Sequence, residues 1–252
     1  MQIRAIRLRT LVPPKASLRD ALKASRLSLR EGDIIAISSK VVSIDEGRCV
    51  PMAGADKLAL IKREADYYLV PGKSRWRRVF TIAGGALVGS AGIDESNGAD
   101  HYILYPLDPL RSARRLRRAL RREYGVEKLG LIITDSMSVP LRRGAQGFAL
   151  AWDGLDPLRD YRGTKDLFDR TIEVEMANVA DALAAAAVLA MGEGREQTPV
   201  ALIRGASSVS LKNRAKGADQ LRVSPEDDLF APLFWGPRWK CGGGGRPSSR
   251  AS

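Results

Sequence analysis

Histidine and cysteine are scarce in this 252-residue chain, which has one histidine, His101, and two cysteines, Cys49 and Cys241. A single histidine excludes a histidine-rich metal site and a Ser-His-Asp triad with a histidine to spare. The cysteines lie far apart, which excludes a cysteine metal motif and a disulfide framework and favours a reducing cytoplasmic setting. Any catalysis must therefore rely on carboxylates, hydroxyls, lysines, arginines or a bound metal ion.

Long apolar runs are also missing. No segment approaches the roughly 20 consecutive apolar residues that a bilayer-spanning helix needs, so we expect no membrane partner. The first eight residues alternate between apolar and polar side chains, a pattern typical of a strand rather than of a signal peptide. With 44% hydrophobic residues, the chain still has enough apolar material for a substantial core.

Acidic residues are in deficit, because 29 Asp and Glu face 41 Lys and Arg and leave a net charge of +12. Such an excess suits phosphate-bearing partners, either nucleotides or nucleic acid. Much of it lies in residues 111–122, where apolar residues recur at helical spacing. No aromatic side chains interleave these arginines as a base-stacking platform would require, so we favour a solvated helix face over a nucleic-acid footprint.

Short strand-like runs alternate with helical segments, which predicts a mixed α/β (α+β) fold. The predicted strands are 3–8, 34–37, 79–83, 102–104, 129–133, 148–152 and 200–203. The predicted helices are 17–27, with Ser17 as N-cap, 57–69, 110–124 and 174–191. We assign residues 1–205 to one domain. We expect residues 206–240 to form an extension that packs on it, and the Gly/Ser/Arg-rich tail 241–252 to be disordered.

One polar segment, residues 90–97 (Ser-Ala-Gly-Ile-Asp-Glu-Ser-Asn), follows a predicted strand and a glycine-rich stretch. Glycine lets the backbone approach a ligand closely. The carboxylates of Asp94 and Glu95 and the amide of Asn97 are hard oxygen donors of the kind that magnesium and manganese prefer. An Asx-type turn that closes the strand is the alternative, and the segment alone does not decide between them.

Three further polar segments follow predicted secondary structure. Asp135 and Ser136 come just after the strand 129–133, at the kind of strand end where α/β sites form. Glu193 lies between two glycines that end the helix 174–191. Ser39 and Lys40 follow the strand 34–37, where a hydroxyl and an ammonium can hold phosphate oxygens. Each segment also has a purely structural interpretation, as a strand-ending turn, a helix stop or a polar connection. None is a Walker loop, because the Gly-Lys-Ser/Thr ending is absent.

Taken in order, these segments resemble the coenzyme F(420)-0:L-glutamate ligase family over about residues 1–205. The resemblance rests on an ordered set of motifs. They are Gly32-Asp33, Ser38 to Ser43, Glu46-Gly47-Arg48, residues 90–97, Ile133 to Ser136, Asp160-Tyr161-Arg162-Gly163, Met191-Gly192-Glu193 and Val200 to Gly205.

The resemblance implies a GTP-dependent ligase that adds L-glutamate to a deazaflavin cofactor precursor through an amide bond. GTP phosphorylates the acceptor carboxylate, and the glutamate amine attacks the acyl phosphate. Two divalent cations, Mg²⁺ or Mn²⁺, and a K⁺ assist. The family fold is a mixed α/β structure that forms an intertwined homodimer.

The family's site residues can be carried over to matching positions. The implied metal ligands are Asp94, Asp135, Ser136 through its oxygen, and Glu193. The implied GTP contacts are Arg9, Thr10, Leu11, Val12, Ser39, Lys40, Asn97, Met191, Gly192, Gly194, Arg195, Glu196, Gln197 and Thr198.

Two departures from the family pattern bear on activity. Ile44 stands where the family usually has a lysine, and Lys40, four residues earlier, is the candidate substitute. The loop 138–145 is rewritten, so the acceptor can differ from the deazaflavin, with a folate-like acceptor as one candidate. Two alternatives remain open: a basic nucleic-acid-binding protein on a ligase fold, and a nucleotide sensor without turnover.

Overall fold

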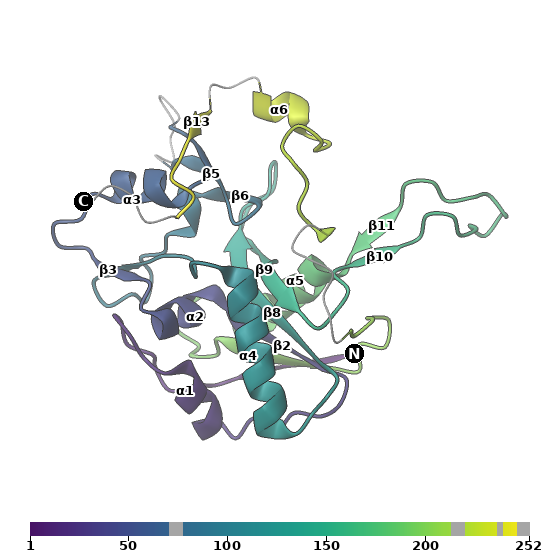
Figure 1. Ribbon diagram of the computed structural model, residues 1–252, viewed down its shortest axis with the longest axis horizontal. Coiled ribbons are helices and arrows are strands. Elements are labelled where there is room, and N and C mark those ends of the chain that lie inside the picture. The colour runs from purple at the N-terminus through teal and green to yellow at the C-terminus, as the bar shows by residue number, and fades with distance from the viewer. Residues whose placement is uncertain (71–77, 213–219, 236–238, 246–252) are drawn as a thin grey trace.

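A five-stranded sheet forms the centre of the molecule in the computed structural model, which describes residues 1–70, 78–212, 220–235 and 239–245. Its strands lie in the order β1 (Gln2–Ile6), β12 (Val200–Arg204), β2 (Asp33–Ser38), β8 (Leu129–Met137) and β9 (Gln146–Asp153) (Figure 1). Within this sheet β2 and β8 run parallel, and the other neighbouring strands are antiparallel. The predicted mixed α/β class is confirmed.

Helices cover both faces of this sheet. They are α1 (Leu18–Ala24), α2 (Ser39–Glu46) and α4 (Pro109–Tyr124) on one face and α5 (Val179–Met191) on the other. Ile35 and Ile37 of β2 point into the larger apolar core under α1, α2 and α4. Ile34 and Ala36 point into the smaller core under α5. A strand buried on both faces requires a continuous apolar run, and residues 34–37 of β2 form such a run.

Helix α4 carries the arginine-rich segment, and one of its arginines is not solvated as expected. Arg117 is only 3% exposed; its Nε donates to the Leu129 carbonyl and its Nη1 lies 3.2 Å from Asp153 Oδ2. A buried guanidinium is tolerated because it is paired and hydrogen-bonded. Arg115, by contrast, pairs with Asp45 and Glu46 near the surface. In the described ranges, no helix combines the length and apolar character needed to cross a bilayer.

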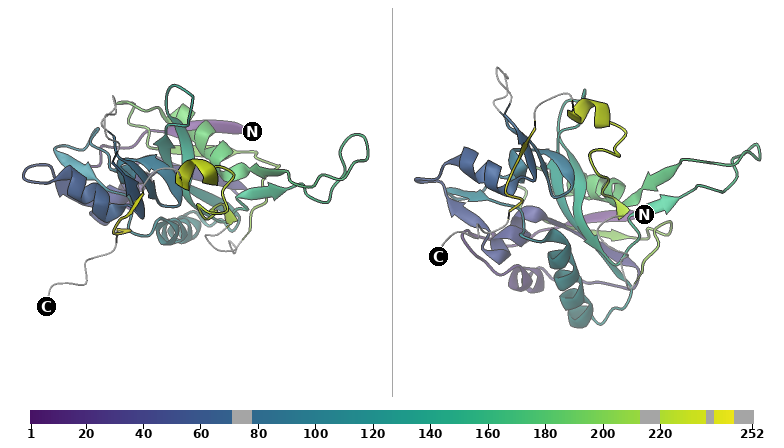
Figure 2. Two further views of the ribbon diagram at one scale, coloured as in Figure 1. Left: turned by 90° about the horizontal axis from the view of Figure 1, so that it is seen from above. Right: turned by 45° about the horizontal axis from the view of Figure 1, so that its top comes forward.

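A second, smaller layer lies beside the central sheet (Figures 1 and 2). It contains a sheet of β13 (Lys240–Cys241), β4 (Tyr67–Leu69), β5 (Phe80–Ala83) and β6 (Ala86–Gly89), a pair of β3 (Cys49–Pro51) and β7 (His101–Ile103), and α3 (Lys57–Glu64). The predicted helix 57–69 is therefore wrong at its end. It stops at Glu64 because Tyr67 and Tyr68 pair with β5, and aromatic side chains suit a paired strand.

A long hairpin arm extends from the body in every view (Figures 1 and 2). Its base is the pair β10 (Leu158–Asp160) and β11 (Met176–Asn178). The predicted helix 174–191 was wrong at its start, because Val174 belongs to this arm and α5 begins at Val179. Asn178 caps that helix by accepting a hydrogen bond from the Asp181 amide.

Two polar segments that follow predicted strands, and for which a turn or a polar connection was an alternative, lie inside regular elements. Asp135 and Ser136 belong to β8, which continues to Met137 paired with β9, with a register shift between Ile133 and Thr134. Ser39 and Lys40 open helix α2 directly after β2. Both segments are therefore held on rigid backbone rather than on loops.

The C-terminal extension packs on the body only in part. Leu211 and Leu221 lie against the core under α5, whereas Leu229 and Phe230 are 88% and 56% exposed, just before α6 (Ala231–Trp235). Cys241 pairs with Tyr67 in the smaller sheet, so the ordered chain runs past residue 241, where we expected the disordered tail to begin. Residues 246–252 of that tail lie outside the described residues.

Helix α1 begins as its sequence predicts, with Ser17 Oγ accepting from the Asp20 amide at 3.2 Å. We expect Ser17→Ala to lower the free energy of unfolding by about 1 kcal/mol, because an amide at the helix start loses its acceptor. Urea unfolding measures the change. Ser17→Asn should restore stability, since asparagine caps as well as serine, and equal losses in both variants would contradict the cap interpretation.

Candidate active site

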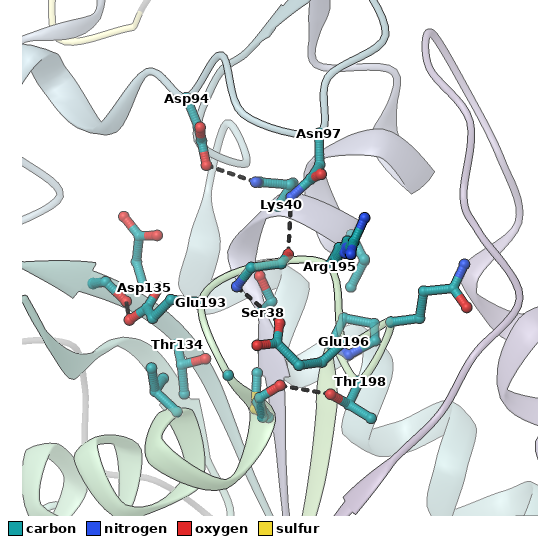
Figure 3. Close-up of a pocket in the computed structure, with 18 of the residues that line it drawn as sticks. Ser38, Lys40, Asp94, Asn97, Thr134, Asp135, Glu193, Arg195, Glu196 and Thr198 are labelled. Carbon is teal, nitrogen blue, oxygen red and sulfur yellow. Dashed lines mark hydrogen bonds and ion pairs between the residues drawn. The ribbon is translucent and has the colours of Figure 1, made fainter.

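Besides Arg78, Gly89 and Val188, five separate segments of the chain line a cavity of about 750 Å³. They are the turn after β1, the start of α2, the segment 92–97, the outer half of β8 and the loop 191–199 after α5 (Figure 3). Segments that are far apart in the sequence thus line one continuous cavity. The parallel pair β2 and β8 delivers two of them to the same edge of the sheet.

Most of the residues predicted for the site line this cavity. Those that do are Arg9, Thr10, Leu11, Lys40, Asp94, Asn97, Asp135, Ser136, Met191, Gly192, Glu193, Gly194, Arg195, Glu196, Gln197 and Thr198. Two predicted contacts do not. Val12 lies outside the lining and is 56% exposed. Ser39 is buried behind the wall, and its hydroxyl points at Asp135 instead.

Asp135 is held by two hydroxyl groups. Ser39 Oγ donates to its Oδ1 at 3.2 Å, and Tyr105 Oη donates to its Oδ2 at 2.5 Å. Burial raises the pKa of the Asp135 carboxyl to about 6, and the nearby charge of Asp94 adds to this rise. The hydrogen bonds from Tyr105 and Ser39 oppose it without cancelling it.

Asp94 faces the same cavity but is stabilised as an anion. Its Oδ2 lies 2.7 Å from Lys40 Nζ (Figure 3). Its Oδ1 accepts hydrogen bonds from the amide and hydroxyl of Ser96. Burial alone would raise the pKa of Asp94, but the Lys40 ammonium and the Ser96 donors lower it overall. The pKa values of the two aspartates are therefore shifted in opposite directions although both side chains belong to one site.

The loop after α5 is fastened to three other parts of the site. Glu193 Oε1 accepts from Ser136 Oγ at 2.7 Å, and the Gly194 carbonyl accepts from Asn97 Nδ2 at 3.1 Å. Gln197 donates to Thr10 Oγ1 at 3.0 Å. These contacts bring the predicted ligand Glu193 beside Ser136 and the predicted GTP contacts Asn97 and Gln197 onto the same rim.

The backbone around Asp94 adopts uncommon conformations. Non-glycine residues with positive φ cluster between β6 and β7: Ser90, Ala91, Asn97, Ala99 and Asp100. Such conformations cost free energy and persist where the surrounding structure enforces them, often at functional sites. The Ser96 amide also donates to Asp94 Oδ1, which is the hydrogen bond of an Asx-type turn, so the segment both makes this turn and lines the cavity.

The donors in the cavity fit hard divalent cations in kind, although they do not form a closed cage. Among the described residues, no group of three or more His, Cys, Asp or Glu side chains is arranged to hold a metal ion. Asp94 and Asp135 are close enough for one charge to affect the pKa of the other, and Ser136 and Glu193 form a second oxygen pair. Carboxylate and hydroxyl oxygens are what magnesium and manganese take, with water and substrate oxygens completing the shell.

Sequence reasoning missed several residues of the site. Arg7 and Arg78 add two guanidinium groups to the lining, and Tyr105 contacts Asp135 from behind. Alternation along β1 could have suggested Arg7, because it precedes the predicted contact Arg9 by two positions. Nothing local marked Arg78 or Tyr105, whose positions depend on long-range packing.

The mixed α/β fold forms a cavity whose lining combines carboxylates with arginines and a lysine, groups that suit phosphate oxygens and their counter-cations. The chain belongs to the F420-0:Gamma-glutamyl ligase family, whose model matches residues 15–205.

Three relatives carry the name coenzyme F420:L-glutamate ligase. That of Methanopyrus kandleri is 35% identical over 91% of this chain and 97% of its own length. That of Methanocaldococcus jannaschii is 34% identical over 79% of this chain and 85% of its own length. That of Methanosarcina acetivorans is 37% identical over 71% of this chain and 76% of its own length. The similarity confirms the family that the ordered motifs predicted, and with it a ligase.

Proposed function

We propose that this protein is a GTP- and divalent-metal-dependent ligase that joins the amine of L-glutamate to a carboxylate of deazaflavin coenzyme F(420)-0 or of a folate-like acceptor. Family membership supports the reaction type. The observation that carries the proposal is the meeting of Asp94, Asp135, Ser136 and Glu193 in one cavity with Lys40, Arg9 and Arg195. Neither the nucleic-acid alternative nor the turnover-free sensor receives support from the family match.

In the proposed reaction, an acceptor carboxylate oxygen attacks the γ-phosphorus of GTP, and GDP leaves. The glutamate amine then attacks the acyl carbon, loses a proton, and inorganic phosphate leaves. Two bound divalent cations, Mg²⁺ or Mn²⁺, with a K⁺, would supply charge neutralisation on the transferring phosphoryl group. Asp94, Asp135, Ser136 and Glu193 would hold the divalent ions.

The remaining lining residues would orient the nucleotide. Arg9 and Arg195 present guanidinium groups, which bind phosphate oxygens in a fixed geometry. Asn97 fastens the loop 191–199 over the cavity through the Gly194 carbonyl. Binding of this kind would place the γ-phosphate in line with the incoming oxygen, which is the principal task of a phosphoryl-transfer site.

Lys40 is the proposed phosphate cation in place of the lysine that the family usually has at Ile44. Both side chains line the cavity from one face of α2, a helical turn apart. We expect Lys40→Met to raise the KM for GTP by about ten- to hundredfold, the scale of one hydrogen bond to a charged group. Lys57→Met is the matched control, because Lys57 pairs with Glu95 outside the lining. An unchanged KM would contradict the assignment.

The acceptor is proposed to be selected by the loop 138–145, which begins two residues after the cavity-lining residue Ser136. Leu141 in this loop is fully exposed and has a φ of 60°, and Arg142 and Arg143 are exposed beside it. An exposed apolar residue next to two cations suits a flat ring system that carries acidic groups.

Turnover tests the function directly. Purified protein with Mn²⁺, GTP and L-glutamate should consume GTP only when an acceptor is added, and mass spectrometry should show the acceptor extended by glutamyl units. F(420)-0 and a folate, assayed side by side, identify the acceptor class. GTP hydrolysis without any glutamylated product across both acceptors would overturn the proposal.

We also propose a homodimer, active in the cytoplasm. The hairpin arm exposes Leu167, Phe168 and Val174 at 97%, 83% and 82%. Apolar side chains on an extended arm suit burial against a second copy of the chain. Light scattering on the purified protein should give twice the monomer mass, and a Phe168→Asp variant should shift it toward the monomer.

A further inference from the structure

Tyr105 lies behind the cavity wall and reaches the site through a single atom. The residue is 9% exposed, and its hydroxyl donates to Asp135 Oδ2 at 2.5 Å. The other carboxylate oxygen accepts from Ser39 Oγ at 3.2 Å. Each oxygen of Asp135 thus has a protein donor, which fixes the plane of the carboxylate before any ligand arrives.

The ring of Tyr105 packs directly on the backbone of the segment that carries Asp94. Gly92 has a φ of 68°, and a Cβ built there would overlap the ring carbons of Tyr105. Only glycine permits both this conformation and this approach. Because Asp94 follows Gly92 by two residues, the same ring contacts the segment of one aspartate and hydrogen-bonds the other.

Both partners of this contact are themselves anchored. The Ala91 amide donates to buried Thr81 Oγ1 at 2.8 Å, and that hydroxyl donates to the Val88 carbonyl at 2.6 Å. The carbonyl of Tyr105 accepts from Arg48 Nε at 2.9 Å. The turn and the tyrosine therefore cannot move independently without breaking buried hydrogen bonds.

We propose that Tyr105 is a positioning residue that orients Asp135 and sets its placement relative to Asp94 for binding a divalent cation. The inference rests on the proposed function, in which these two aspartates are cation ligands. Groups that hydrogen-bond a metal ligand fix its orientation, and losing one commonly costs about ten- to hundredfold in metal affinity. Tyr105 needs no contact with substrate or cation to act in this way.

Mn²⁺ binding to the whole protein tests the proposal without relying on turnover. Electron paramagnetic resonance of free Mn²⁺ gives the Kd for wild type and Tyr105→Phe, a change that removes the hydroxyl and keeps the ring over Gly92. We expect the Kd to rise by about ten- to hundredfold. In turnover assays the apparent KM for Mn²⁺ should rise likewise, with kcat largely recovered at saturating Mn²⁺. Tyr102→Phe, three positions earlier, is the matched control and should bind as wild type does.

A second variant distinguishes positioning from general loosening of the fold. Gly92→Ala should also weaken Mn²⁺ binding, because it displaces the ring, but it should add little in a Tyr105→Phe background, where no hydroxyl remains to be displaced. Fully additive effects, or wild-type Mn²⁺ affinity in folded Tyr105→Phe, would overturn the inference and leave the proposed function intact. Wild-type protein that binds no Mn²⁺ would instead overturn the metal part of the proposed function and this inference with it.

Discussion

Asp135→Asn is expected to lower kcat for acceptor glutamylation by about a thousandfold, the scale seen when one charge-stabilising group is removed from a phosphoryl- or acyl-transfer site. Asp135 lines the cavity and accepts hydrogen bonds from Ser39 and Tyr105 behind it, and Asp94 is near enough to affect its pKa. Asparagine keeps the shape but loses the negative charge that would hold a cation. Measurement of kcat at saturating GTP and Mn²⁺ checks the prediction.

The loss should not come from unfolding. The asparagine Oδ1 can still accept from Tyr105, and its Nδ2 can donate to Ser39 Oγ, so both hydroxyls keep a partner. Asp108→Asn is a matched control, because Asp108 caps α4 outside the cavity and asparagine caps a helix equally well. A folded Asp135→Asn protein within tenfold of wild-type kcat would remove Asp135 from the proposed mechanism.

Much of the fold could be predicted because its core elements carry strong local patterns. The apolar run of β2 is buried on both faces, and Ser17 caps α1 through the expected bond. The candidate site also followed from the sequence, but only through the ordered motifs. No spacing in the chain indicates that Asp94 and Asp135 come together, since that depends on how the smaller layer docks on the central sheet.

The remaining errors share a physical cause, which is tertiary pairing that overrides a local signal. Polar residues after Ile133 resemble a turn, yet β8 continues through Asp135 because β9 pairs with it and the polar side chains face the cavity. Val174 resembles the start of α5, yet it belongs to the arm. Nothing in the local sequence distinguishes Tyr105, because its packing depends on the space beside Gly92, which belongs to another segment.

The stability of metal-free protein should depend on pH through Asp135, and the sign follows from the direction of its shift. The pKa of Asp135 rises from 3.8 to about 6 on folding, so the folded protein holds this proton more tightly than the unfolded chain does. The resulting stabilisation is fully present below pH 4 and is lost as the pH rises through 6. A pKa shift of this size changes the free energy of unfolding by at most about 3 kcal/mol, and by less because the carboxylate is open to the cavity.

Comparison of wild type with Asp135→Asn isolates this effect, because the other titrating groups largely cancel in the difference. In urea unfolding with EDTA, the free energy of unfolding of the variant should rise relative to that of the wild type by up to about 3 kcal/mol between pH 4 and pH 7. The contribution of Asp94 to stability depends on pH in the opposite sense, because Lys40 lowers the pKa of this carboxyl. Both proteins contain Asp94, so its contribution largely cancels in the comparison. A constant difference across this range would mean that Asp135 titrates normally. Saturating Mn²⁺ at pH 7 should then raise the free energy of unfolding of the wild type but not of the variant. Such a result would mean that cation binding recovers the free energy lost by burying this carboxylate, as expected of a ligand kept for function rather than for folding.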